Sequence, residues 1–270
     1  MRFLLMCIFL YFCKMKSVRK KIVLLAFLSF FVPSFAYEIN EHRAEANSDF
    51  TTRVGFDIKR KIYKGFSLTF SEEARFKANS SKFDRLYSIL SFDYKVNNYF
   101  KTGIGYTYML INNGDKEFNH RHRINLDLVA SYSVNQWNFS LRERPELFVR
   151  MGDVNPLKIA NPAVDLRSRI MVEYSIRNKP LKPRLAFEIF NTLNAPKFAK
   201  GNYISRYKTE VGLKWEMADS HILNIYYRFD VDNARDISID YVANTIDCVD
   251  LTYKCSYKHI LGIAYTFDWK

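Results

Sequence analysis

Beyond Ala36 the sequence lacks any apolar run of roughly 18 residues, the length that marks a membrane-spanning helix. Cysteine is also scarce: the chain has four, and Cys7 and Cys13 precede Ala36. A structural zinc site needs a full set of Cys or His ligands, and no second Cys or His pair stands at a suitable spacing from Cys248 and Cys255. We therefore expect no transmembrane helix after Ala36, no metal and no cofactor.

The positive charge of the chain is modest once its first 36 residues are set aside. These residues contain six Lys and Arg and no acid, so the net charge of +13 falls to +7 (13 − 6) for the remainder. A mildly basic chain gives no argument for nucleic acid as a partner.

The first 36 residues differ in kind from the rest. Two apolar segments flank the basic stretch KMKSVRKK, and the second ends in Ser34-Phe35-Ala36. A basic region, a short apolar run and small residues at the cleavage point are typical of a secretory signal peptide, which we expect to be cut after Ala36. A retained membrane anchor is the alternative, and Met15 is an alternative start. The mature domain is predicted to span residues 37–270.

Apolar and polar residues alternate along most of the mature sequence. In the last segment, HILGIAYTFDWK, Tyr265, Phe267 and Trp269 share one face, and Thr266 and Asp268 share the other. Alternation sustained over about 9–11 residues predicts strands long enough to cross a bilayer. Aromatics make up 16% of the chain although its mean hydropathy is only -0.22, which is typical of strands with a lipid-facing and a water-facing side.

Short and long connections alternate between the predicted strands. The strands are expected near 50–60, 65–77, 83–96, 99–110, 120–133, 137–149, 164–176, 183–193, 203–217, 221–231 and 257–269, with a further one near 38–47. Tight turns at one end and longer loops at the other are typical of an outer-membrane barrel. The sequence thus predicts an all-β fold, a single transmembrane antiparallel up-and-down β-barrel of about 12 strands, within a range of about 10 to 14.

A soluble sandwich or lipocalin-like barrel would alternate in the same way. Its inward face would be apolar, whereas the face opposite the aromatic residues is strongly charged here, which is costly in a packed core. Aromatic residues such as Tyr132, Trp137 and Trp215 stand near strand ends, as the girdles of a membrane barrel require. Both features favour the membrane barrel.

Several segments resemble a family of small outer-membrane barrels known as domain of unknown function 2490. The segments are HRHRINLDLVASY, SLRERPELF, AFEIFNTLN, YRFDVDN and HILGIAYTFDW, which together span most of residues 120–270. The resemblance implies a barrel fold and a membrane location. It implies no established activity and brings no catalytic residues.

The charged face would line the interior of such a barrel. Its candidate lining residues are basic Arg121, Arg123, Arg142, Arg144, Arg167, Arg169, Arg184, Arg206 and Arg228, and acidic Asp127, Glu173, Glu188 and Glu210. The excess of basic residues predicts a narrow, porin-like channel for small anionic or acidic solutes, because a basic wall attracts anions. The alternative is a structural barrel plugged by a salt-bridge network, since Arg pairs bidentately with carboxylates, with external loops that dock partners.

A third hypothesis is an outer-membrane lipid-modifying enzyme. Such an enzyme would place Ser, His and an acid or amide together on the barrel wall. No His-x-Ser pairing occurs, and Ser88, Ser140 and Ser168 stand on strands without an evident partner. We therefore expect no enzymatic activity and assign no catalytic residue.

The segment 232–256 is predicted to be an external loop. It contains Cys248 and Cys255, which we expect to form a disulfide in an oxidising compartment. It is also acidic, and clustered carboxylates bind cations in some proteins, although a solvated loop is the simpler interpretation.

The final strand is predicted to direct insertion. Its alternating aromatics Tyr265, Phe267 and Trp269 match the signal read by the barrel-insertion machinery, and outer-membrane lipid is the expected surrounding. We expect export through the inner membrane and residence in the cell outer membrane. The sequence identifies no other protein partner.

Overall fold

The computed structural model describes the chain apart from residues 1–37, 115–116, 197, 200–203, 243–244 and 270. The predicted signal peptide, residues 1–36 with its alternative start Met15, therefore lies outside the described residues. No helix in the described part of the chain is long and apolar enough to cross a membrane.

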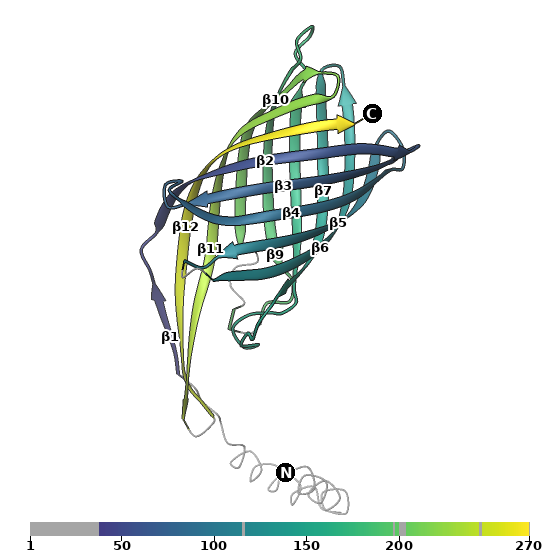
Figure 1. Ribbon diagram of the computed structural model, residues 1–270. Helices are drawn as coiled ribbons and strands as arrows, with labels where there is room; N and C mark the ends of the chain where they lie inside the picture. Colours follow the sequence, from purple (N-terminus) through teal and green to yellow (C-terminus); the bar gives the residue numbers. More distant parts are fainter. Residues whose placement is uncertain (1–37, 115–116, 197, 200–203, 243–244, 270) are drawn as a thin grey trace, which may run out of the picture. The chain divides into compact units, whose positions relative to one another are not determined.

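Twelve strands follow one another along the described residues. They are β1 (Glu38–Arg43), β2 (Asn47–Tyr63), β3 (Phe66–Lys77), β4 (Lys82–Lys95), β5 (Phe100–Asn112), β6 (Phe118–Val134), β7 (Trp137–Arg150), β8 (Ala163–Tyr174), β9 (Leu181–Thr192), β10 (Arg206–Ala218), β11 (His221–Val242) and β12 (Thr245–Trp269). From β2 to β12, each strand pairs with the next one in sequence, and β12 also pairs with β2 (Figure 1). The predicted all-β barrel is confirmed.

The closing pair of strands is parallel. Ser256 of β12 stands opposite Asn47 of β2, and the register continues to Trp269 opposite Arg60. The strand predicted near 38–47 exists as β1, but it pairs with β12 outside the closure, so the barrel itself consists of the eleven strands β2 to β12. The edge of β12 serves both partners in succession, because Ala44 N, just after β1, donates to Tyr253 O at 3.0 Å.

The two ends of the barrel differ in their connections. At one, which we call the turn end, short turns join β2 to β3, β6 to β7 and β10 to β11. Gly65 and Asn135 adopt φ values of 81° and 52° in two of these turns, and Gly and Asn accept this left-handed conformation most readily. At the other, the loop end, the longest connections are 151–162 and 193–205.

The predicted external loop 232–256 is wrong. β11 continues to Val242 and β12 begins at Thr245, so Cys248 and Cys255 both stand on β12. Seven residues of extended strand separate their Cα atoms by about 23 Å, whereas a disulfide requires less than about 7 Å. The predicted disulfide is accordingly not formed.

Alternation along each strand separates an apolar outer face from a polar inner face. On β9, for example, Leu185 and Phe187 are 54% and 45% exposed, whereas Ala186 and Glu188 between and beyond them are 4% and 6% exposed. Because side chains alternate across a strand, every second residue of a strand faces inward, and most of the charged residues belong to this inward set.

Candidate functional site

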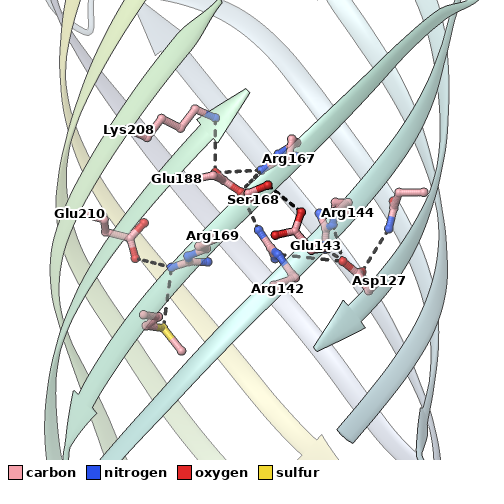
Figure 2. A network of polar contacts seen from close by, with 12 residues as sticks. Asp127, Arg142, Glu143, Arg144, Arg167, Ser168, Arg169, Glu188, Lys208 and Glu210 are labelled. Atoms are coloured by element: carbon pink, nitrogen blue, oxygen red, sulfur yellow. Dashed lines mark hydrogen bonds and ion pairs between the residues drawn. The ribbon is translucent and has the colours of Figure 1, made fainter. Parts of the chain in front are cut away.

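Twelve charged side chains from β6 to β11 meet inside the barrel. Figure 2 shows part of this set, around Glu188 and Asp127. Eight are cations, Arg123, Arg142, Arg144, Arg167, Arg169, Arg184, Lys208 and Arg228, and four are carboxylates, Asp127, Glu146, Glu188 and Glu210. We call this set the central ionic network. Each carboxylate in it is within 4.0 Å of at least two of the cations.

Glu188 on β9 is shared by three cations from three strands. Its Oε1 accepts from Arg142 at 2.7 Å and from Arg167 at 3.0 Å, and Lys208 Nζ lies 4.0 Å from Oε2. Arg142 is on β7, so its side chain passes over β8 to reach Glu188. The Glu188 side chain is only 8% exposed. This carboxylate thus joins four neighbouring strands across the barrel interior.

Glu210 on β10 has the same role one strand further. Arg228 of β11 lies 2.5 Å from its Oε2, and Arg169 and Arg184 each lie 3.2 Å from its Oε1. The Glu210 side chain is 5% exposed. A buried charged group needs several partners, because burying an ion without partners costs roughly several kcal/mol.

Asp127 and Glu146 complete the network on β6 and β7. Arg144 donates to both oxygens of Asp127, from Nε at 2.5 Å and from Nη2 at 2.8 Å, which is the bidentate geometry that suits Arg. Glu146 accepts from Arg167 at 2.7 Å and lies 3.7 Å from Arg123.

Positive charges stand directly opposite one another in the strand register. Arg142 faces Arg169, and Arg144 faces Arg167, across the β7–β8 pair. Like charges opposite each other are destabilising, so the carboxylates between them offset only part of the repulsion. The buried Nε atoms of Arg123, Arg142, Arg167 and Arg184 have no hydrogen-bond acceptor among the described residues. The interior is therefore rich in unused donors.

Two buried tyrosines, Tyr87 on β4 and Tyr226 on β11, contact arginines of the interior. Arg75 donates to Tyr87 Oη at 3.1 Å and its guanidinium lies 3.9 Å from the Tyr87 ring centroid. Arg228 lies 4.9 Å from the ring centroid of Tyr226. Tyr87 stands two residues from Arg85 on β4, and Tyr226 stands two residues from Arg228 on β11. This spacing places each tyrosine on the same face as an inward-facing arginine, and it is the sequence signal that identifies both tyrosines as inward-facing.

Most of the sequence-predicted lining residues meet in this network. Arg123, Arg142, Arg144, Arg167, Arg169, Arg184, Arg228, Asp127, Glu188 and Glu210 belong to it. Arg121, Arg206 and Glu173 do not: Arg121 lies 5.7 Å from the Phe148 ring centroid, Arg206 pairs with Asp232 at 2.5 Å, and Glu173 stands opposite Arg184 in the register.

The residues of the predicted insertion signal lie on the outer face of β12. Tyr265 stacks on Phe56 of β2 with ring centroids 5.8 Å apart, and its hydroxyl is 2.5 Å from His221 Nδ1. The guanidinium of Arg60 lies over the Trp269 ring, 4.4 Å from the ring centroid. These contacts fasten β12 to both of its neighbours in the closed barrel.

The outer face also carries polar pairs that the sequence pattern did not reveal. Ser168 Oγ donates to Glu143 Oε2 at 2.6 Å, between the inward-facing arginines of β7 and β8. His122 and His120 share hydrogen bonds of 2.7 and 2.5 Å with the hydroxyls of Tyr106 and Tyr108. The Ser168 hydroxyl is thus bound to a carboxylate.

In the part of the chain that is described, no group of three or more His, Cys, Asp or Glu is placed to hold a metal ion.

Two cavities lie on the turn-end side of the interior. The outer one, about 450 Å³, is lined by Lys59, Lys61, Lys95 and Lys101 and by turn residues, and no described residue that lines it is acidic. We call it the lysine vestibule. The second, about 290 Å³, is the inner cavity, lined by Thr69, Ser91, Asp93, Lys101, Asp127, Val129, Ser140, Arg142, Arg144, Arg169 and Met171. Lys101 lines both, so the two cavities adjoin.

Comparison with known proteins gives one family and one distant structural likeness. Residues 54–238 match a family described as "Protein of unknown function (DUF2490)". No curated protein matches. Among solved structures, the chain is similar to a NanC porin solved in a rhombohedral crystal form, with a TM-score of 0.43 and 13% sequence identity, over 79% of this chain and 97% of the porin chain.

Proposed function

This chain belongs to the DUF2490 family of proteins of unknown function, and from the charge of its interior we propose that it forms a narrow, anion-selective channel in the outer membrane of a Gram-negative cell. The observation that carries the proposal is the imbalance of the central ionic network, in which eight cations share four carboxylates. A positive surplus enclosed by low-dielectric walls attracts anions and repels cations.

The outer face supports the membrane location. Ile104, Leu126, Ile170, Leu185 and Val211, each from the middle of a different strand, are 43–58% exposed. A soluble monomer rarely exposes a continuous apolar band around its whole circumference, whereas lipid surrounds such a band without cost.

Aromatic pairs border this band at the turn end. Trp137 packs against Tyr174 with ring centroids 4.7 Å apart, and Tyr99 stacks on Tyr132 at 6.3 Å. Amphipathic rings at that level are typical of the membrane–water interface.

The small bore supports a low conductance. A barrel of eleven strands is narrower than a porin of about 16 strands. The central ionic network further narrows it, because Arg142 and Arg169 each reach over a neighbouring strand to their carboxylates. Any conducted anion must pass close to guanidinium groups, which favours anion selectivity at the expense of conductance.

The test is the reversal potential of the purified protein in a planar bilayer under a salt gradient. We compare the wild type with a variant that carries Arg123→Gln, Arg144→Gln and Arg169→Gln. In this variant every carboxylate of the network keeps a cation: Asp127 keeps Arg142, Glu146 keeps Arg167, and Glu210 keeps Arg184 and Arg228. Five cations then face four carboxylates, so the barrel should fold while its anion selectivity falls markedly.

A matched control is Arg60→Gln, which removes one cation from the outer face, where Arg60 lies over Trp269. Its reversal potential should equal that of the wild type. Cation selectivity in the wild type, or an unchanged reversal potential in the triple variant, would contradict the channel. Absence of any current from correctly folded protein would instead favour the plugged structural barrel, which the depth of burial of Glu188 and Glu210 supports.

The proposal includes the route to the membrane and excludes catalysis. Export would follow cleavage after Ala36, so N-terminal sequencing of the mature protein should begin at Tyr37. Insertion would use the barrel-insertion machinery, which reads the aromatic face of β12. We propose no enzymatic activity, because the hydroxyl of Ser168 donates to Glu143 and not to an imidazole.

A further inference from the structure

The lysine vestibule forms a positively charged entrance. Lys59, Lys61, Lys95 and Lys101 contribute four positive charges to its lining, and no carboxylate of the described chain lines it. Lysine ammonium groups on flexible stems attract anions without holding them in a fixed geometry. The vestibule therefore concentrates anions at the turn end without selecting among them.

The inner cavity continues inward from this entrance. Lys101 belongs to both linings, and Arg142, Arg144 and Arg169 supply three guanidinium groups to the inner one. An anion that leaves the vestibule thus moves from mobile ammonium groups to planar guanidinium groups. Guanidinium matches the geometry of carboxylate and phosphate with two parallel donors.

Half of the cations around the inner cavity are neutralised within it. Asp93 lies 3.4 Å from Lys101, and Asp127 is held by two hydrogen bonds from Arg144. Arg142 and Arg169 differ, because their nearest carboxylates, Glu188 at 2.7 Å and Glu210 at 3.2 Å, do not line the cavity. Among the residues that line the cavity, four cations therefore face two carboxylates.

The cavity also offers neutral donors. Ser91 of β4 and Ser140 of β7 line it together with Thr69 of β3. Two guanidinium groups and several hydroxyls are the complement of an oxyanion that carries further oxygen atoms.

We propose that Arg142 and Arg169, assisted by Ser91 and Ser140, form a binding site for one small oxyanion, a carboxylate or a phosphate, which enters through the lysine vestibule. The inference rests on the proposed channel for its physiological role, but the site itself is defined by the cavity. Its volume of about 290 Å³ is at the lower end of ligand pockets, so the ligand is small.

Isothermal titration calorimetry on the full barrel in detergent micelles tests the site without requiring conduction. The probes are sodium gluconate, a carboxylate with hydroxyls, and inorganic phosphate, each against chloride at equal ionic strength. Saturable binding of either probe above chloride is expected, and the tighter probe identifies the carboxylate or phosphate class. Binding of neither probe above chloride overturns the site.

The variant for the test is Arg142→Gln with Arg169→Gln. Glu188 keeps Arg167 and Lys208, and Glu210 keeps Arg184 and Arg228, so the network retains its carboxylate partners. Affinity should fall about tenfold or more, because two charge-assisted contacts are lost. The control is Arg150→Gln with Arg206→Gln, which removes the same charge from residues outside the cavity and should bind like the wild type.

Heat-modifiable migration on gels shows whether each variant is folded. Unchanged affinity in the folded Arg142 and Arg169 variant would overturn the assignment of these residues. Saturable binding by a protein that passes no current would keep the site and refute the channel. Anion selectivity without saturable binding would support the channel and refute the site.

Discussion

Tyr226 occupies the space that a side chain at position 262 would need. A Cβ atom on Gly262 would lie 2.0 Å from Cζ of the Tyr226 ring, which is closer than atoms in contact ever approach. Tyr226 is 7% exposed and sits against Arg228. Glycine on β12 is therefore what allows an aromatic ring on β11 to lie flat inside the barrel.

Gly262→Ala should destabilise the barrel by about 1–3 kcal/mol, because the ring has to leave a well-packed site. Urea unfolding in lipid vesicles, followed by tryptophan fluorescence, measures the loss. In a Tyr226→Ala background the same substitution should cost little, since the obstructing ring is absent. Equal costs in both backgrounds would show that the ring is not the cause.

Glu188→Gln should lower the free energy of unfolding by about 3–5 kcal/mol, because Arg142, Arg167 and Lys208 lose a shared buried counter-charge. The matched control is Glu216→Gln. Glu216 also binds two cations, Lys182 and Lys214, but its side chain is 35% exposed, so its loss should cost about 1 kcal/mol or less. Equal losses of unfolding free energy in the two variants, measured by urea unfolding, would show that burial of Glu188 is not the cause.

Replacing Lys59, Lys61 and Lys95 by Gln should lower single-channel conductance most strongly at low salt. The screening length is about 10 Å at 0.1 M salt and about 3 Å at 1 M, so the lysine vestibule concentrates anions only in the first case. The corresponding Lys→Arg variants preserve the charge and should conduct like the wild type. A loss of conductance that is the same at both salt concentrations would point to a change of shape.

Deleting residues 267–270 should prevent insertion. Phe267 and Trp269 of β12 stand opposite Ile58 and Arg60 of β2, and their loss leaves backbone groups of β2 unpaired in lipid. The expected result is protease-sensitive protein without heat-modifiable migration. Asp268→Asn, which alters only an inward-facing side chain, should insert normally, and normal insertion of the deletion variant would refute the requirement.

The strands of the barrel follow directly from alternation in the sequence. Because one face of each strand contacts apolar surroundings, period-two patterning marks β2 to β10 to within a few residues of their observed bounds. Closure does not follow in this way. The edge of β12 is long enough to pair with β1 near Tyr253 and with β2 from Ser256, and nothing in the local pattern of Glu38–Arg43 shows which strand closes the barrel.

The extended ends of β11 and β12 were missed although their signal was present. Ile237, Ile239 and Tyr241 alternate with Asp236 and Asp240, which is a strand pattern. The density of carboxylates in this segment favours a solvated loop, whereas its periodicity favours a strand. Acidic residues are disfavoured in strands in general, but a paired strand with one solvated face accommodates them.

Parity also identified most of the central ionic network, but not its connections. Lys61 has the parity of Lys59, and an extension of β2 by one pleat would have placed it in the lysine vestibule. That Arg142 binds Glu188 and not a residue on the adjacent β8 depends on strand tilt and side-chain reach. Such contacts depend on three-dimensional curvature, which a pattern along one strand does not encode.

The odd number of strands in the closed barrel fixes where the ends of its chain emerge. Each strand carries the chain from one mouth to the other, so eleven crossings leave Asn47 at the loop end and Trp269 at the turn end. In the proposed outer membrane, an epitope placed just before Asn47 would face one compartment and an epitope placed after Trp269 the other. An antibody added to intact cells would then recognise one tag and miss its counterpart, unlike in even-stranded barrels, where both ends share one compartment.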